Sequence, residues 1–266
     1  MLTASVHMGR VGLGATTPQL FRASDGKVYV VKLQNNRLGP KVLANELLGS
    51  KMGEILGLSF PRGGVIKLEE QVIKRSRILL AARVTPGRHY ACEYLSHTGY
   101  ITRSNLGKAA NRGQMAGVML FDHMFHNLDR TFNRRNLLVR QEREGLKIYA
   151  IDNSHLFRRG RWTVEWLEKL APTIKLNRHW AYGWLLKHYL TPGDFAPYLE
   201  RIQAIPDSEL AGLVAGIPQE WLPQDSERQA LERYLITRRD MIEEIAVCLR
   251  ALIPNKHRGS DIHMIK

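Results

Sequence analysis

Alternation of apolar and polar residues marks the first third of the chain as rich in β-strands. The segment GKVYVVKLQ, residues 26–34, predicts a strand that ends near Lys32. The tripeptide SDG just before it is a hairpin turn signal, and a glycine-rich bend, GRVGLGATTPQLF, occupies residues 9–21. Further strands are predicted at residues 63–68, 78–84 and 89–95.

Helical spacing is clear in two segments of the first half. In residues 39–58, Pro40 suits a first helical turn and Gly57 suits a helix end. A second helix is predicted over residues 104–126, with Ser104 as its N-terminal cap. The apolar stripes of these two helices are formed by Leu48, Met52 and Ile55, and by Met115, Val118, Met119 and Phe125.

The second half begins with strands and becomes helical. Residues 136–139 and 147–152 are predicted to be two short strands joined by a polar turn. Beyond Trp162 nearly every segment has helical periodicity. The chain is therefore predicted to be an α+β protein, with a β-rich N-terminal part at residues 1–95 and a helical part at residues 96–266.

The last helix has the most regular pattern. Apolar residues follow a four-three spacing from Leu231 to Leu252, interrupted once by Arg238. Ser226 and Gln229 have the spacing of a capping box and predict where this helix begins.

Composition adds one unusual feature, a strongly basic charge. The chain has 39 Lys and Arg against 25 Asp and Glu, a net charge of +14, which favours anionic partners. Part of the excess is local, because residues 130–161 contain nine basic and three acidic residues, a net +6. A solvated basic surface is the plainer explanation. Cys92 and Cys248 have no metal-ligand spacing, and no secretory or membrane-spanning segment is visible, which predicts a cytoplasmic protein.

Several residues of chemical interest occur in one order along the chain. They are Gly12 and Gly14 in the bend, Lys32 at a strand end, Glu46 on a helix, Asp129 in a loop and Asp152 after a strand. Phosphoryl transfer from ATP uses such parts: glycines that admit phosphates, a lysine aimed by a glutamate, an aspartate facing the attacking hydroxyl and a second that holds metal. The combination predicts a kinase-type enzyme.

Each of these residues also has an ordinary structural explanation. Lys32 could be a solvated strand end, and Glu46 could be a surface acid of its helix. Asp129 could cap a helix or pair with Arg130, and Asp152 could stabilise a turn. Their joint occurrence in one order is what favours the chemical interpretation.

Two acidic segments resemble a known family. NLDRTFNRRNLLV, residues 127–139, followed by IYAIDNSHLF, residues 148–157, is similar to the catalytic and metal-binding segments of HipA-like kinases. The segments VVKL and ANELLGSKMGEILGL agree with the same family more loosely. The resemblance implies a two-lobed protein-kinase-like fold that uses ATP and Mg²⁺. It also implies that Asp129 is catalytic, that Asp152 binds metal, and that Glu46 aims Lys32 at the phosphates.

The loop departs from the usual kinase spacing. Such kinases place a metal-binding asparagine five residues after the catalytic aspartate, where this chain has Arg134. The candidates are Asn133, four residues after Asp129, and Asn136, seven residues after it. Asn136 is favoured because it directly precedes an apolar strand, and a metal ligand needs a rigid support. The two extra residues would push Arg134 and Arg135 outward, toward the acceptor or the phosphates.

The glycine-rich bend matches the family poorly, so the nucleotide contacts of Gly12 and Gly14 are the loosest part of the resemblance. Thr16 and Thr17 follow the bend, where HipA-like kinases can phosphorylate themselves. A phosphate there would repel the triphosphate. The alternative is that these threonines satisfy backbone groups in a turn.

Two functions from different classes remain. The first is an ATP- and Mg²⁺-dependent phosphotransferase that acts on a serine or threonine hydroxyl of a protein, and the basic charge is compatible with an acceptor protein associated with tRNA or other nucleic acid. The second is a catalytically inactive scaffold that binds nucleic acid through its charge. The presence of Lys32, Glu46, Asp129 and Asp152 together favours the enzyme.

Overall fold

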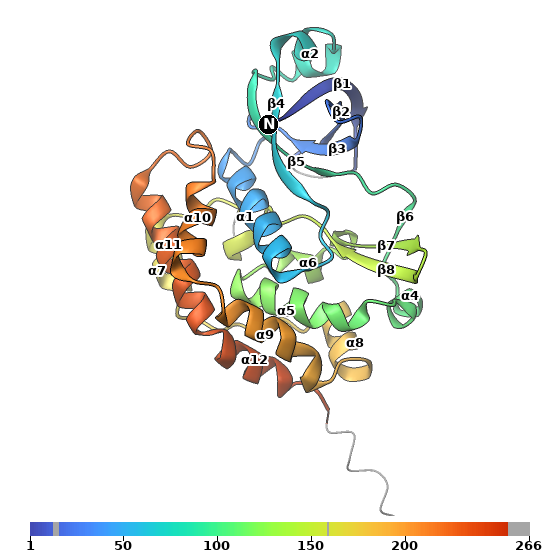
Figure 1. Cartoon of the computed structure of the whole chain (residues 1–266), viewed down its shortest axis with the longest axis vertical. Coiled ribbons are helices and arrows are strands. Elements are labelled where there is room, and N and C mark those ends of the chain that lie inside the picture. Colours follow the sequence, from blue (N-terminus) through green and yellow to red (C-terminus); the bar gives the residue numbers. More distant parts are fainter. Residues whose placement is uncertain (13–15, 159, 255–266) are drawn as a thin grey trace, which may run out of the picture.

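The computed structural model describes residues 1–12, 16–158 and 160–254. Figure 1 shows a small β-rich N-terminal region above a larger, mostly helical region, as the sequence predicts. The N-terminal strands form a closed barrel in the order β1-β2-β3-β5-β4. Neighbouring strands are antiparallel, except that β1 and β4 are parallel. The strands are β1 (Leu2–Arg10), β2 (Gln19–Ala23), β3 (Val28–Lys32), β4 (Gly63–Leu68) and β5 (Gly87–Glu93).

Two short helices follow β4, and one of them replaces a predicted strand. They are α2 (Glu70–Lys74) and α3 (Arg77–Ala81). Residues 78–84 were predicted to be a strand, and that prediction is wrong. Ser76 caps α3 by accepting a hydrogen bond from the Leu79 backbone N–H at 3.3 Å. Only Leu79 of the run ILL is buried in the barrel core, and a single buried residue with exposed neighbours on both sides does not distinguish a helical turn from a strand.

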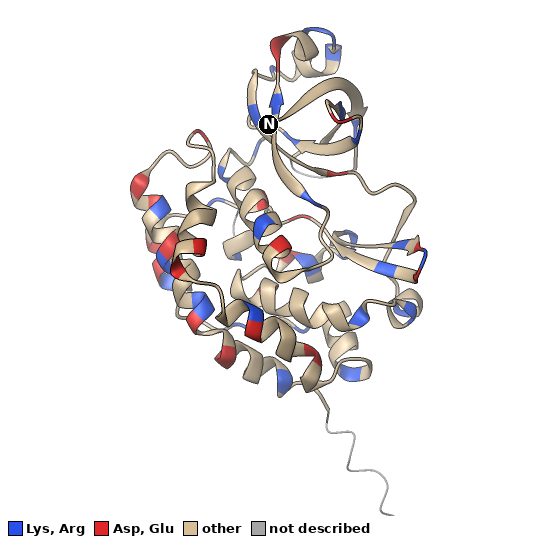
Figure 2. Ribbon diagram, in the orientation of Figure 1, with Lys and Arg blue, Asp and Glu red and all other residues tan. Residues whose placement is uncertain are grey.

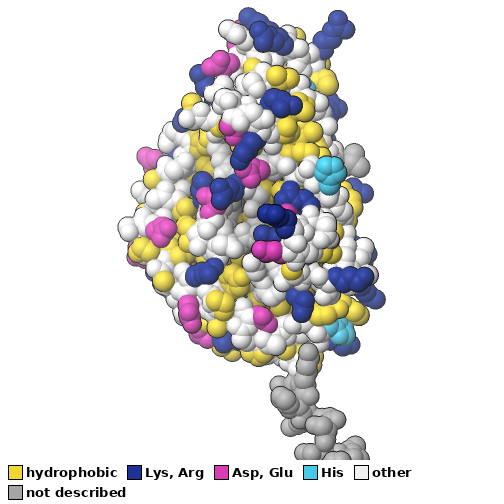
Figure 3. All heavy atoms as spheres, turned by 45° about the vertical axis from the view of Figure 1, so that its right-hand side comes forward, with side chains coloured by type: hydrophobic (Ala, Val, Ile, Leu, Met, Phe, Trp, Pro, Cys, Tyr) yellow, Lys and Arg dark blue, Asp and Glu magenta, His cyan; other side chains and the backbone are white. Residues whose placement is uncertain are grey.

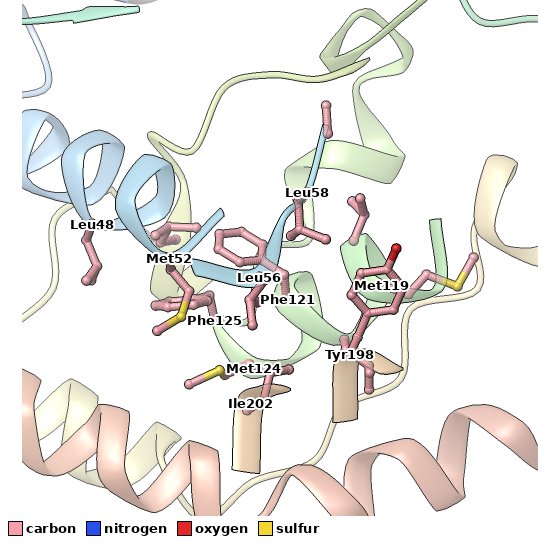
Figure 4. Close-up of a cluster of buried hydrophobic side chains, with 14 of the residues drawn as sticks. Leu48, Met52, Leu56, Leu58, Met119, Phe121, Met124, Phe125, Tyr198 and Ile202 are labelled. Carbon is pink, nitrogen blue, oxygen red and sulfur yellow. The ribbon is translucent and has the colours of Figure 1, made fainter. Parts of the chain in front are cut away.

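Helix α1 (Lys41–Leu56) connects the two regions. It follows Pro40 and ends at Gly57, whose φ of 65° is the left-handed conformation that glycine adopts freely. The helix packs between the barrel and the helical region, and side chains on nearly all of its faces are buried. Its lower part packs against α5 (Met115–Met124) and α9 (Ala196–Gln203) in the main core, as Figure 4 shows for the labelled apolar side chains.

The helix predicted over residues 104–126 is divided. It consists of α4 (Arg103–Lys108), η1 (Arg112–Gln114) and α5. The cap of α4 is Thr102, which forms a capping box with Asn105, so the prediction of Ser104 is wrong by two residues. The helix stops because Ala109 is extended and the next backbone N–H donates to the Leu146 carbonyl at 2.8 Å.

A three-stranded antiparallel sheet lies below the barrel. Its order is β6-β7-β8, with β6 (Thr98–Tyr100), β7 (Leu137–Glu142) and β8 (Gly145–Ala150). The two strands predicted near residues 136–139 and 147–152 are therefore confirmed as a hairpin. The hairpin lies at the right in Figure 1, and the short helices α6 (Asp129–Phe132) and η2 (Arg134–Asn136) precede it.

Helices make up most of the chain after β8, as predicted. They are η3 (Leu156–Arg158), α7 (Val164–Leu170), α8 (Ala181–His188), η4 (Pro192–Phe195), α9, α10 (Asp207–Ala215), α11 (Asp225–Asp240) and α12 (Ile242–Arg250). None of the described helices is both long and apolar enough to cross a membrane. Both cysteines, Cys92 and Cys248, are free, as expected.

The last predicted helix is two helices, α11 and α12, that meet at Met241. The predicted capping box is wrong, because α11 begins one residue after Gln224 and no side chain caps it. Arg238, which interrupts the apolar pattern, is buried. Its guanidinium donates to the carbonyls of His123, Met124, Ala171 and Thr173, so it satisfies backbone oxygens of two other segments.

Candidate active site

A cavity of about 580 Å³ opens between the barrel and the β7–β8 hairpin. Most of the residues predicted from the sequence line it. They are Gly12, Thr16, Lys32, Glu46, Asp129, Asn136 and Asp152. Apolar side chains line it as well, including Val11, Pro18, Val30, Leu38, Leu138 and Ile151. A cavity of this size with apolar and charged walls can accommodate a nucleotide.

Three charged side chains from distant segments meet at this cavity. Lys32 is the last residue of β3, and its ammonium pairs with Glu46 on α1 and, at 2.9 Å, with Oδ1 of Asp152. Lys32 and Glu46 are buried, whereas the Asp152 side chain is 31% exposed. The Lys32–Glu46 contact shows that Lys32 is not the solvated strand end of the alternative interpretation.

Lys32 and Asp152 stabilise each other's charges, whereas burial opposes the charge of Glu46. Burial lowers the pKa of Lys32, but the carboxylates of Asp152 and Glu46 outweigh burial, so its pKa lies above the ordinary value and the ammonium is retained. Burial likewise opposes ionisation of Asp152, but the Lys32 charge and the Ser154 hydrogen bonds hold its pKa well below the ordinary value. Burial raises the pKa of Glu46 to about 7, with the Lys32 charge acting against it.

Asp152 is held in an unusual backbone conformation. Its φ is 66°, a left-handed value that aspartate tolerates better than most residues. The conformation lets the carboxylate fold back onto its own chain, because Oδ1 accepts from the Ser154 hydroxyl and, at 3.1 Å, from the Ser154 backbone N–H. The Asn153 backbone N–H donates to Glu46 at 3.2 Å, which ties the same turn to α1.

Asp129 and the two candidate asparagines form a second cluster at the cavity. Asn136 is buried, and its amide N–H donates to Oδ2 of Asp129 at 2.7 Å. The Asn136 backbone carbonyl accepts from the Ile151 N–H at 3.0 Å, which places this residue beside the strand end that carries Asp152. Asn133 instead caps η2 by accepting from the Arg135 N–H at 3.2 Å.

A buried arginine beneath this loop was not predicted as part of the site. Arg130 has no exposed surface, and its guanidinium donates to Asp122 at 2.8 Å, to the Ile151 carbonyl at 2.6 Å and to Asn153 at 2.7 Å. It therefore joins α5, the loop that carries Asp129 and the turn that carries Asp152. The sequence held one signal, an acid at position 122 within an otherwise apolar helix.

The glycine-rich bend is only partly described. Gly12 has a φ of 68° and lines the cavity, whereas Gly14 lies outside the described residues. Thr16 is buried and lines the cavity. Thr17 is exposed with a φ of 44° and does not line it.

The side chains at the cavity fit a hard divalent cation. Asp152 carries a negative charge, and Oδ1 of Asn136 accepts only a 3.2 Å hydrogen bond from Asn133 among the described residues. Carboxylate and amide oxygens are the ligands that Mg²⁺ prefers.

The family model described as HipA-like kinase matches residues 6–246. A comparison with curated protein sequences found no match. Solved structures with a similar fold include the Helicobacter pylori proinflammatory kinase CtkA, with a TM-score of 0.58 and 12% identity over 93% of this chain and 96% of that chain. The Golgi casein kinase with Mn and ADP bound has a TM-score of 0.52 and 11% identity, over 94% and 74% of the two chains. Hydra Fam20 with sugar has a TM-score of 0.51 and 11% identity, over 94% and 86%. At these identities the likeness shows the fold, which is kinase-like, as predicted.

Proposed function

Because the chain belongs to the HipA-like kinase family, we propose that this kinase transfers the γ-phosphoryl group of ATP to a serine or threonine hydroxyl of a protein, with Mg²⁺ as cofactor. One observation carries the proposal. The Lys32–Glu46–Asp152 cluster and the Asp129–Asn136 pair line the same cavity, although they come from segments up to 120 residues apart. The Golgi casein kinase, solved with Mn and ADP, supports the use of a nucleotide and a divalent metal.

Lys32 is proposed to bind phosphate oxygens. Its ammonium already has two carboxylate partners, and the Glu46 contact keeps the side chain directed into the cavity. When a triphosphate arrives, Lys32 can donate to it, since an ammonium has three donor hydrogens. Gly12 also lines the cavity, and its φ of 68° is a backbone conformation that glycine adopts freely beside a bound phosphate.

Asp129 is proposed to orient the acceptor hydroxyl and to accept its proton. Its carboxylate is 29% exposed at the cavity, and the Asn136 amide fixes one of its oxygens at 2.7 Å. A positioned carboxylate of this kind contributes to proton transfer once the hydroxyl attacks phosphorus.

Asp152 and Asn136 are proposed to hold Mg²⁺. Such an ion would supply positive charge that neutralises the phosphate groups of ATP. Asp152 is suited to this role because the Lys32 charge and the Ser154 hydrogen bonds keep its carboxylate ionised. Asn136 is suited because the strand that follows it is paired with β8 and therefore rigid.

An inactive nucleic-acid scaffold is the alternative. Against it, buried ionic clusters are expensive to maintain, and a scaffold has no need for the Lys32–Glu46–Asp152 arrangement beside a cavity. The enzyme is therefore the better supported hypothesis.

The test combines nucleotide binding with turnover. ATP with Mg²⁺ should raise the melting temperature of the protein, because a ligand at one hundred times its Kd stabilises the folded state by about 2.7 kcal/mol. Asp129→Ala should keep this shift and lose phosphoryl transfer by roughly 10²- to 10⁴-fold in a radiolabel assay. The matched control is Glu209→Gln, an exposed acid on α10 that should leave both measurements unchanged.

No thermal shift at millimolar ATP and Mg²⁺ would favour the scaffold. Full turnover by Asp129→Ala would show that another residue accepts the proton.

A further inference from the structure

The loop between Asp129 and Asn136 exposes four consecutive residues at the edge of the cavity. Phe132, Asn133, Arg134 and Arg135 are exposed, whereas Thr131 and Asn136 on either side are buried. This segment contains the two residues that exceed the usual kinase spacing. The structure shows what each of its side chains contacts.

Two of the four side chains hold the loop against the segment before α8. The Phe132 ring lies 4.5 Å from the His179 ring, centroid to centroid. The Arg134 guanidinium lies over the Trp180 ring, 4.6 Å from its centroid. Asn133 caps η2 from within the loop. These contacts hold the backbone of the loop in place.

Arg135 is the remaining side chain, and it lines the cavity together with Asp129 and His155. Its backbone N–H donates to Asn133, but its guanidinium makes no ion pair or hydrogen bond with any residue that the structure describes. An unpaired guanidinium in the cavity that Asp129 also lines is available to bind a carboxylate or a phosphate group, which arginine holds through two parallel N–H donors.

We propose that Arg135 selects the acceptor, and that the substrate is a protein segment whose hydroxyl-bearing residue is flanked by an anionic side chain. This inference rests on the proposed function. It assigns acidic peptide segments as the substrate class of this cavity, and it assigns Arg135 as a residue that determines specificity.

The charges at the cavity do not fit a nucleic-acid backbone, because Glu46, Glu93, Asp129 and Asp152 line it as well. Among the described residues that line it, Lys32 and Arg135 are the only Lys or Arg, and Lys32 is already paired with Glu46, which leaves Arg135 to bind a single anionic group. Nucleic-acid binding depends on many phosphate contacts. Figure 3 shows Lys and Arg side chains spread over the outer face with Asp and Glu among them, so total charge alone selects no acceptor.

The experiment uses the full chain and a set of serine peptides. The peptides differ only in the residues that flank serine, which are Glu, phosphoserine, Gln or Lys, and kcat/KM is measured for each. The wild-type protein should prefer Glu and phosphoserine over Gln by about tenfold, as expected for a bidentate charged contact. Comparison of kcat/KM for the Glu peptide and the phosphoserine peptide shows whether a carboxylate suffices or a phosphate is required.

Substitution of Arg135 tests the residue itself. Arg135→Gln should abolish the preference, and Arg135→Glu should reverse it toward Lys peptides, with the KM for ATP changed by less than about twofold. Only the backbone of Arg135 takes part in the fold, so both variants should remain folded. The control is Arg143→Gln, because Arg143 is an exposed arginine at the tip of the β7–β8 hairpin without an ion-pair partner among the described residues, and this variant should keep the wild-type preference.

Several results would overturn the inference. The first is a wild-type enzyme that has no preference for anionic peptides. The second is a preference for anionic peptides that Arg135→Gln retains. The third is an Arg135→Gln variant with a raised KM for ATP and an unchanged peptide preference, which would place Arg135 on the nucleotide. ATP turnover without phosphorylation of any peptide would also exclude the acidic-peptide class while leaving the proposed kinase activity intact. Absence of ATP turnover under all conditions would instead refute the proposed function, and this inference with it.

Discussion

Two asparagines three residues apart have different surroundings, and their roles follow from them. Asn136 is buried and its amide N–H donates to Asp129, whereas its amide oxygen accepts a longer hydrogen bond of 3.2 Å from the Asn133 amide. Asn133 is exposed, and its side-chain oxygen accepts from the Arg135 N–H at the start of η2. The first arrangement suits a metal ligand, and the second suits a helix cap.

This difference makes a prediction at the residue scale. Asn136→Ala should raise the Mg²⁺ concentration for half-maximal activity by roughly tenfold or more, because a ligand is lost. Asn133→Ala should leave the Mg²⁺ requirement nearly unchanged and reduce the free energy of unfolding by about 1 kcal/mol, because a cap is lost. A metal titration and a denaturant titration of both variants check these outcomes. If Asn133→Ala shifts the Mg²⁺ requirement and Asn136→Ala does not, the two roles must be exchanged.

The side chain of Arg130 connects several elements and fixes their relative positions. It lies at the start of α6 and contacts Asp122 of α5, the carbonyl at the end of β8 and Asn153 in the following turn. Asp122 also accepts from Asn127 at 3.0 Å and from Tyr182 of α8. The relative position of Asp129 and Asp152 therefore depends on the buried ion pair between Arg130 and Asp122.

Arg130→Gln should destabilise the protein by about 3–5 kcal/mol, because it leaves the Asp122 carboxylate buried without its charged partner. Activity should fall as well, since the loop and the turn lose a common support. Asp122→Asn combined with Arg130→Gln should recover part of the stability, because the unpaired charge is gone. Denaturant unfolding of the two single variants and the double variant measures this coupling. Additive effects in this cycle would mean that the pair does not act as a unit.

Across the whole molecule, basic and acidic side chains are widely distributed, whereas histidines that include His89 and His123 are buried in the interior. Figure 2 shows Lys and Arg in both regions of the protein, interspersed with Asp and Glu. His89 and His123 are buried, and each accepts a backbone N–H at one ring nitrogen, from Gln34 and from Asn177, at 2.9 Å. A protonated ring could not accept these bonds, and burial lowers the pKa of both histidines to about 4.

This arrangement predicts a loss of stability in mild acid. Between pH 6.5 and about 4 the unfolded chain takes up protons on His89 and His123 that the folded chain excludes, so the free energy of unfolding should decrease as pH falls through this range. Each histidine should account for on the order of 2 kcal/mol at the lower end. Above pH 6.5 neither should contribute a slope. Glu46 contributes to the pH dependence of the unfolding free energy with the opposite sign. Because its pKa is raised, the folded chain binds a proton below about pH 7 that the unfolded chain does not yet bind.

Comparison with a variant isolates the histidine contribution. His123→Gln should unfold with a shallower dependence on pH than the wild-type protein in denaturant titrations between pH 7 and 4.5. His97→Gln, a change at an exposed histidine, should keep the wild-type slope. Equal slopes in all three proteins would show that His123 is not the group responsible.

Local sequence determined the β-rich N-terminal region, the helical remainder and the order of the ionisable residues. Alternation and 3.6-residue periodicity depend on which face of an element is buried, and these patterns are visible in a single segment such as residues 26–34 or 231–252. The order of Lys32, Glu46 and the two aspartates was likewise visible, because a motif is a property of spacing along the chain.

Tertiary contacts decided where the predicted helix over residues 104–126 is interrupted and which partners the arginines have. They divided residues 104–126 where the chain turns to bond with Leu146, they made Arg238 a partner for carbonyls of other segments, and they joined Arg130 to Asp122. They also separated Arg134, which stacks on Trp180, from Arg135, which faces the cavity. None of these outcomes follows from local pattern, because each depends on a partner distant in the chain whose position exists only once the core has packed.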